Sequence, residues 1–338
     1  MPEYSDHRDP PADDADLVAH LMRAAGRRIG PPPSAYDRVL SAATTTWARK
    51  VRRRRLLRVS AAAAASIAVV SAVVALLTNL PRAPVALVGH VDRVTGECEI
   101  RRDNAWTAVA GAADLGAGER IRTHAESRAG ILLAGEVSLR LAERTEVLLE
   151  SAARVRVLAG KIYVDTGVSP ASAHPRIEVV TPAGVAADYG TQFEVRYVEG
   201  AFRVRVREGR VSIDPSDAAA LGAVAGDDVT IRAGAIERQR IAATDAEWQW
   251  TQSIAPKPDI DGRPVSFLLD WVARETGKEV RFAEPALVRK ANTTILHGDI
   301  GDLAPLDALA LMLATTDLEH AILDDGTILI RLRDSQQR

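Results

Sequence analysis

The sequence has few of the residues that form covalent cross-links and metal sites. It contains one cysteine, Cys98, among 338 residues, so no disulfide can form within the chain. None of the seven histidines stands at metal-ligand spacing from another His, Cys or carboxylate. The run Glu97-Cys98-Glu99 is a poor ligand set as well, because successive side chains of a strand point to opposite faces. We therefore expect no metal and no cofactor.

Catalytic motifs are missing too. The chain has no Gly-x-Ser-x-Gly elbow, no phosphate-binding loop and no dinucleotide-binding fingerprint. We therefore expect that the protein is not an enzyme. Its net charge is −2, so the whole molecule is not attracted to polyanions, and we expect no nucleic acid partner.

One long stretch has no charge at all. Residues 59–80 read VSAAAAASIAVVSAVVALLTNL, and as a helix this run would span roughly 33 Å, enough for a hydrocarbon core of about 30 Å. Pro81 and Pro84 follow it, and seven basic residues precede it: Arg49, Lys50, Arg52, Arg53, Arg54, Arg55 and Arg58. The sequence predicts a transmembrane helix over 56–80 with a cytoplasmic N-terminus and an exported C-terminal part, because basic residues that flank a membrane span stay on the cytoplasmic side. A buried helix of a soluble domain is the alternative that these flanks disfavour.

Residues 1–55 are expected to form a short cytoplasmic segment with two amphipathic helices. Apolar residues recur at helical spacing over 13–28, prolines interrupt at 31–33, and Ser34 can cap a second helix. The proposed partner-binding residues are Leu17, Leu21, Val39, Leu40 and Trp47. Two interpretations stay open: a stripe that docks on a cytosolic protein, or a marginal helical hairpin that leads to the membrane.

Residues 85–241 have a different character. Short stretches of alternating polarity follow one another, separated by Gly, Asn and Asp, and no long helical pattern intervenes. Such spacing predicts an all-β domain, either a sandwich, a barrel or a β-solenoid. Glu199-Gly200 and Glu208-Gly209 are two expected hairpin turns.

Part of this region resembles the FecR family of periplasmic regulators. The resemblance rests on TPAGVAADYGTQFEVRYVEGAFRVRVREGRVSI, residues 181–213. The matching positions are Thr181, Pro182, Gly184, Gly190, Thr191, Phe193, Val195, Val204, Val206, Glu208, Gly209 and Val211. The resemblance implies a β-domain that directly follows one signal-anchor helix in a bacterial inner membrane, with the C-terminus in the periplasm.

The remaining residues resemble a second family. A linker over 242–258 is expected to precede a small α+β domain over 259–334. LLDWVARETGKEVRF (268–282) and LAPLDALALMLATTDLEHAILDDGTILI (303–330) are similar to the short N-terminal domain of secretins and TonB-dependent proteins, called STN. That resemblance implies a docking module, usually part of the TonB-dependent transducer that signals to a FecR protein. The expected fold class is thus multi-domain, with a cytoplasmic helical segment, one transmembrane helix, an all-β FecR-like domain and an α+β STN-like domain.

One peptide bond is a candidate for chemistry. Thr191 follows Gly190, and a threonine hydroxyl can attack the preceding carbonyl when the peptide is strained. Some regulators of the FecR family are similar in cutting themselves at this Gly-Thr bond. The alternative is that Gly190 supplies a backbone angle and Thr191 starts a strand.

These features together predict a single-pass inner-membrane regulator of the FecR type. The resemblance implies a periplasmic sensor whose cytoplasmic N-terminus controls an extracytoplasmic-function (ECF) sigma factor. A TonB-dependent transducer or another envelope protein is the expected partner on the periplasmic side. The alternative is a membrane-tethered envelope-binding or assembly protein that controls no sigma factor.

Overall fold

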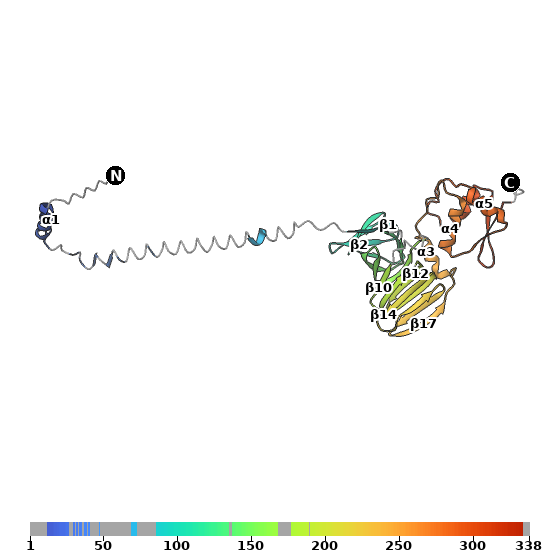
Figure 1. Ribbon diagram of the computed structural model, residues 1–338, viewed down its shortest axis with the longest axis horizontal. Coiled ribbons are helices and arrows are strands. Elements are labelled where there is room, and N and C mark those ends of the chain that lie inside the picture. The colour runs from blue at the N-terminus through green and yellow to red at the C-terminus, as the bar shows by residue number, and fades with distance from the viewer. Residues whose placement is uncertain are drawn as a thin grey trace, which may run out of the picture. The chain divides into compact units, whose positions relative to one another are not determined.

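The computed structural model describes residues 12–26, 30, 32, 34, 35, 37, 38, 40, 47, 69–72, 86–134, 137–167, 177–188 and 190–333. The chain divides into two compact units, Met1–Ala83 and Pro84–Arg338. The first unit contains helix α1 (Ala12–Ala24), which is labelled near the N-terminus in Figure 1.

The expected fold class is wrong. Among the described residues, no helix has both the length and the apolar character that a membrane crossing needs. Of the predicted transmembrane run 56–80, only 69–72 are described, as one helical turn, and the remainder lies outside the described residues. The structure is mostly β, with few helices and a large sheet that nearly closes into a barrel.

Seventeen strands form that sheet. They are β1 (Leu87–Thr95), β2 (Cys98–Arg102), β3 (Ala105–Val109), β4 (Ala113–Gly116), β5 (Arg120–Thr123), β6 (Arg128–Leu133), β7 (Val137–Leu141), β8 (Glu146–Ser151), β9 (Arg154–Asp165), β10 (Glu178–Thr181), β11 (Gly184–Asp188), β12 (Gln192–Val198), β13 (Ala201–Glu208), β14 (Arg210–Pro215), β15 (Leu221–Val224), β16 (Asp227–Arg232) and β17 (Ala235–Arg240).

The long strand β9 connects the two halves of the sheet. Its first half pairs with β8 and with β10, and its second half pairs with β7 and β12. The change falls at Gly160, whose φ is +96°. A Cβ at this position would lie 2.5 Å from the Cα of Thr145, so only glycine fits where the strand bends. The bend folds the sheet back over itself and brings its apolar faces together.

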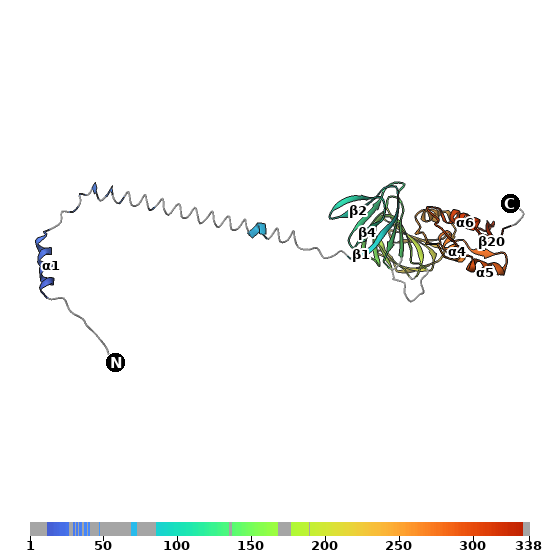
Figure 2. The same ribbon diagram turned by 90° about the horizontal axis from the view of Figure 1, so that it is seen from above.

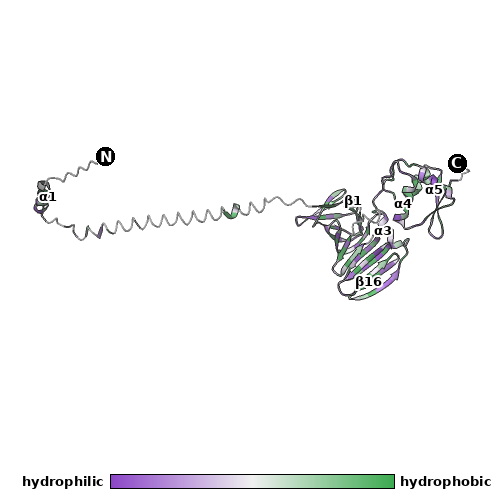
Figure 3. Ribbon diagram, viewed as in Figure 1, coloured by the Kyte–Doolittle hydropathy of each residue, from purple (hydrophilic) through white to green (hydrophobic). Residues whose placement is uncertain are grey.

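A single apolar cluster fills the space between these faces. Residues from distant strands meet there at 0–1% exposure, among them Ile100 of β2, Leu139 of β7, Val164 of β9, Phe193 of β12 and Ile213 of β14. Figure 3 shows hydrophobic and hydrophilic residues mixed along the strands, as the period of two in a strand requires when one face is buried. The core therefore explains the alternation in the sequence.

Of three turns in this region, one is a hairpin and two are corners, where the chain leaves one pair of neighbouring strands for another. The expected hairpin at Glu199-Gly200 is confirmed, because β12 and β13 pair antiparallel on either side of it. The expected hairpin at Glu208-Gly209 is wrong: β13 pairs with β12 and β16, whereas β14 pairs with β11 and β15. The Gly190-Thr191 turn is a corner of the same kind, since β11 pairs with β10 and β14 and β12 pairs with β9 and β13.

The C-terminal elements complete the second unit. They are the 3₁₀ helix η1 (Ala246–Trp248), α3 (Gln249–Gln252), α4 (Val265–Thr276), β18 (Val280–Phe282), α5 (Pro285–Thr293), α6 (Pro305–Ala314), β19 (Leu318–Ile322) and β20 (Ile328–Leu332). The three strands form a small sheet in the order β18-β20-β19. Helix α4 follows Pro264 and ends at Gly277, whose φ of +68° gives the left-handed cap that glycine favours.

The predicted STN-like α+β domain is not supported as a fold of its own. The C-terminal elements belong to the same compact unit as the large sheet, and Figures 1 and 2 show α4 on the side of these elements that faces the sheet. The physical reason is a set of buried charged contacts between α4 and the strands, described below. No observation tests the predicted domain boundaries, which stay predictions.

Candidate functional site

The predicted partner-binding residues are exposed where the structure describes them. Leu17 and Leu21 are 57% and 59% exposed on α1, and Leu40 and Trp47 are 55% and 72% exposed. Leu17 and Leu21 are four residues apart and therefore share one face of the helix. Val39 lies outside the described residues. The structure thus brings Leu17 and Leu21 together, and exposed Val18 and Met22 widen the same stripe.

The Gly190-Thr191 corner is closed by hydrogen bonds. Gly190 has a φ of +79°, and Thr191 is 2% exposed. The amide of Thr191 donates to Oγ1 of Thr166 at 2.9 Å, and the amide and hydroxyl of Thr166 both donate to the Thr191 carbonyl at 3.2 Å. The Thr191 hydroxyl donates to Oδ1 of Asp188. A hydroxyl beside a buried carboxylate is a possible nucleophile, because the carboxylate can accept its proton.

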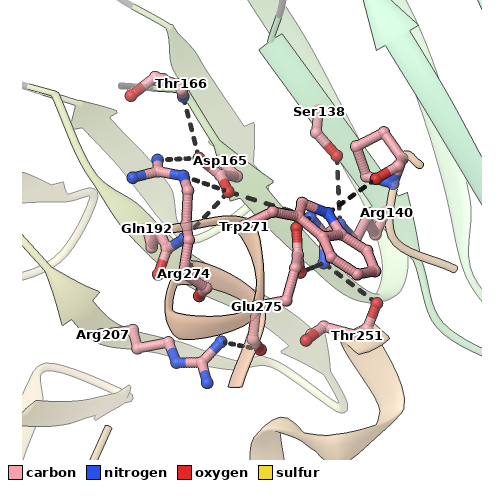
Figure 4. Close-up of polar contacts among 12 residues, drawn as sticks. Ser138, Arg140, Asp165, Thr166, Gln192, Arg207, Thr251, Trp271, Arg274 and Glu275 are labelled. Carbon is pink, nitrogen blue, oxygen red and sulfur yellow. Dashed lines mark hydrogen bonds and ion pairs between the residues drawn. The ribbon is translucent and has the colours of Figure 1, made fainter. Parts of the chain in front are cut away.

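The next residue, Gln192, links this corner to α4. Its side-chain amide donates to Oδ2 of Asp165 at 3.0 Å and to the carbonyl of Arg274 at 3.4 Å. The Arg274 guanidinium in turn donates to Asp165, from Nε at 3.1 Å and also from Nη2. Figure 4 shows these three side chains converging. Burial alone would raise the pKa of Asp165, but the charge and hydrogen bonds of Arg274 and the charge of Arg140 hold it below its usual value.

The adjacent residue on α4, Glu275, forms a fully buried ion pair. Arg140 of β7 is 0% exposed and Glu275 is 3% exposed. Nη1 and Nη2 of Arg140 donate to the two carboxylate oxygens of Glu275 at 2.6 and 2.8 Å, the bidentate geometry that is strongest for this pair. Nη1 also donates to the carbonyl of Thr251, and Nε donates to Oγ of Ser138, each at 3.1 Å. Burial would lower the pKa of Arg140, but Glu275 raises it overall, so the arginine stays charged.

A second arginine attaches the other side of α4. Arg207 of β13 donates from Nε to the carbonyl of Ala243 at 2.9 Å and from Nη1 to the carbonyl of Glu275 at 3.0 Å. Its guanidinium lies 5.7 Å from the ring centre of Trp248, which packs edge-on against Tyr163 at 6.0 Å. The C-terminal end of α4 is therefore held by the strands β7, β9, β12 and β13 together.

The segment before α4 is also bound to the sheet. Glu194 of β12 is 1% exposed and accepts a hydrogen bond of 3.1 Å from the indole of Trp250. Lys161 lies 4.7 Å from the centre of the Trp250 ring and 3.7 Å from the Glu194 carboxylate. Burial raises the pKa of Glu194 and lowers that of Lys161. The expected linker over 242–258 thus contacts β12 and β9 through specific polar groups.

The described residues include no group of three or more His, Cys, Asp or Glu side chains that could hold a metal ion. Cys98 is 1% exposed in the core of the large sheet, and burial raises the pKa of its thiol to about 11. A thiol in this state is a packing residue.

The sequence did not reveal the contacts of α4 with the sheet. Arg140 stands in Val137–Leu141, a strand in which every residue is buried, and a charge in such a strand requires a buried partner. That burial is known only from the structure, because the alternation of Ser138 and Arg140 with apolar residues predicts an exposed Arg140. The partner, Glu275, lies 135 residues further along the chain, so no local pattern identifies it.

Comparison with known proteins gives the class of the central region. Residues 119–212, from the start of β5 into β14, match the family model described as FecR protein. No curated protein matches the chain.

Two crystal structures are similar to it, both of a protein from Parabacteroides distasonis ATCC 8503 that is provisionally named an anti-sigma factor. Their identities are 14% and 15%, and their TM-scores are both 0.34. Each alignment covers 64% of this chain and 99% of the other.

Proposed function

We propose that this protein is a FecR-type regulator whose N-terminal segment binds an ECF sigma factor. The observation that carries the proposal is the match of residues 119–212 to the FecR family. The exposed stripe on α1 supports it, because four large apolar side chains, Leu17, Val18, Leu21 and Met22, stand 53–76% exposed on a helix of 13 residues. Apolar stripes of this kind dock in hydrophobic grooves of partner proteins.

The contacts of α4 offer a way to transmit a signal in this proposal. Arg274 and Glu275 are consecutive, and they bind the sheet through Asp165 and Arg140. Both pairs depend on the position of the same helical turn, and Arg140, Asp165 and Glu275 are buried. A signal that moves α4 would change both pairs at once, which is the two-state behaviour that a regulator requires.

The test is binding of the full-length protein to each ECF sigma factor encoded in the same genome, measured by co-purification after co-expression. The variant Leu17→Asp with Leu21→Asp introduces two acids into the stripe. Its matched control is Ala19→Asp with His20→Asp, which introduces two acids on the other side of α1. We expect one sigma factor to co-purify with the wild type and the control and to be lost from the stripe variant.

If the stripe variant still co-purifies with the sigma factor, α1 is not part of the contact. Absence of every sigma factor from the wild type would overturn the regulator proposal. That result would favour the alternative, an envelope-binding or assembly protein without sigma-factor control. Cross-linking in cells would then identify partners of the second unit, for which a TonB-dependent transducer is one candidate. The cellular location stays a prediction.

A specific contact favours a second activity at the Gly190-Thr191 corner. We propose that the Thr191 hydroxyl attacks the Gly190 carbonyl carbon while Asp188 accepts the hydroxyl proton. The C–N bond breaks, the Thr191 amine takes up a proton, and water then hydrolyses the resulting ester to a carboxylate and a free hydroxyl. The supporting observation is the hydrogen bond from Thr191 to the buried Asp188.

The corresponding test compares the wild type with Thr191→Ala, Thr191→Ser and Asp188→Asn on denaturing gels after prolonged expression. We expect two fragments from the wild type and the serine variant, whereas the alanine variant stays intact and the asparagine variant is cut slowly. A wild type that stays intact, unchanged by Thr191→Ala, would show that the corner is structural only.

A further inference from the structure

A cavity of about 880 Å³ lies beside α4, and Gln192, Arg207 and Arg274, described above, form part of its lining. Phe267 and Trp271 of α4 line it, four residues apart on one helical face, and Pro258 and Ala243 contribute further apolar surface. Its volume is within the roughly 300–1,000 Å³ of sites for small organic ligands. The aromatic wall predicts a ligand with an apolar body.

Six charged residues line the cavity, three acids and three cations, and they differ in whether they have an ion-pair partner. Among the lining acids, Glu208 pairs with Arg274 and Glu279 pairs with Arg281. Two lining cations have no carboxylate partner within the described part of the chain, Arg207 and Lys278. Arg207 donates only to backbone carbonyls and its Nη2 has no hydrogen-bond partner, and Lys278 donates to the carbonyl of Gly326 at 3.2 Å.

One lining acid remains, Asp270, which has no ion pair within the same described residues. Burial raises the pKa of its carboxyl, although the residue as a whole is exposed. Arg207, in contrast, is 5% exposed, and in buried surroundings a charge pair is stronger than in open water. The buried Nη2 of Arg207 has no hydrogen-bond partner among the described residues, and a ligand carboxylate beside it would supply one.

From this arrangement we propose that the cavity binds a small molecule or a peptide end that joins an apolar body to one carboxylate. The apolar body packs on Phe267 and Trp271, and the carboxylate lies toward Arg207 and Lys278. A free aromatic or aliphatic acid and the C-terminus of a peptide with an apolar last residue share this chemistry. The proposal does not depend on sigma-factor binding or on cleavage at Thr191.

The experiment is isothermal titration calorimetry on purified full-length protein with three probes. They are 3-phenylpropionate, the tripeptide Ala-Ala-Phe with a free C-terminus, and the same tripeptide as its C-terminal amide. We expect at least one of the two carboxylates to bind with a Kd below about 1 mM, and the amide to bind at least about tenfold more weakly than the acid because it has no charge for Arg207 and Lys278.

Two variants place the ligand in the cavity. Ala273→Trp fills it from α4 and should abolish binding, whereas Lys278→Gln removes one cation and should weaken binding about tenfold. The matched controls are Ala310→Trp on the exposed side of α6 and Lys290→Gln on α5, which lie outside the cavity lining and should bind like the wild type. Lys278→Gln preserves the test if Ala273→Trp does not fold.

Each outcome of the titrations either supports the proposal or overturns it. Binding of phenylpropionate alone supports the proposal and identifies a free acid, and binding of the tripeptide alone supports it and identifies a peptide end. Absence of heat for both carboxylates overturns the proposal, and so does equal affinity for the acid and the amide. Undiminished binding in both Ala273→Trp and Lys278→Gln overturns it as well.

Discussion

The ion pair between Arg140 and Glu275 allows the sharpest prediction. The variant Glu275→Gln removes the negative charge and leaves the guanidinium of Arg140 buried at 0% exposure. Breaking a buried pair in this way costs about 3–5 kcal/mol of unfolding free energy. Asp165 stays 3.9 Å from Arg140 and compensates part of the charge, so we expect a loss of about 3 kcal/mol, at the lower end of the range.

The measurement is thermal and urea unfolding of the second unit, followed by circular dichroism. A loss of about 3 kcal/mol corresponds to a fall in Tm of roughly 6–12 °C for a unit of this size. The control is Glu319→Gln, which removes the pair with Arg331 on the small sheet, where the two side chains are 30% and 55% exposed. An exposed pair contributes little, so we expect no measurable change in the control.

A double-mutant cycle with Arg140→Met and Glu275→Met then isolates the pair itself. Each single variant leaves one buried charge and should be destabilised, whereas the double variant should recover a large part of the loss, because no unpaired charge remains between these positions. If Glu275→Gln unfolds at the same urea concentration as the control, or if the losses of the single variants simply add, the buried pair does not hold α4 on the sheet.

Three further predictions concern other parts of the second unit. The pKa of Asp165 in the folded protein lies below its unfolded value of about 3.9. Its contribution to the unfolding free energy is therefore present above that pH and is lost as the pH falls through the folded pKa. From pH 6 to pH 3 the urea midpoint should thus fall less in Asp165→Asn than in the wild type. Gly160→Ala should lose at least about 2 kcal/mol, whereas Gly222→Ala, where a Cβ would meet nothing within 4 Å, should unfold like the wild type. Trp248→Phe removes the 2.9 Å hydrogen bond from the indole to the carbonyl of Ala242 and should lose about 1–3 kcal/mol in urea unfolding.

The sequence predicted the local elements of the second unit better than their connections. Alternating polarity identified the strands because each has one face in the core, and Gly277 identified the end of α4. The turn at Glu199-Gly200 was recognised, but Glu208-Gly209 was taken for the same kind of turn. Gly209 has a φ of +80°, as a hairpin residue can have, and only the pairing of β13 and β14 with other strands distinguishes the corner.

The candidate sites differ in how much of each could be predicted from the sequence. Leu17 and Leu21 recur at helical spacing, and the structure describes both as exposed on α1. The hydrogen bond from Thr191 to Asp188 joins residues three apart, yet the corner that creates it depends on the pairing of β11 and β12 with distant strands. The ion pairs of α4 depend wholly on tertiary structure, so composition and periodicity could not predict them.

The separation of Arg140 and Glu275 has a consequence during synthesis of the protein. Glu275 is added to the chain 135 residues after Arg140, and a ribosome adding about 5–20 residues per second needs roughly 7–27 s to cover that interval. Throughout this time Asp165, 3.9 Å away in the folded structure, is available to Arg140, but the carboxylate that makes the bidentate contact is not. A chain that ends before Glu275 therefore contains every strand of the large sheet but lacks the ion pair that fixes α4 to it.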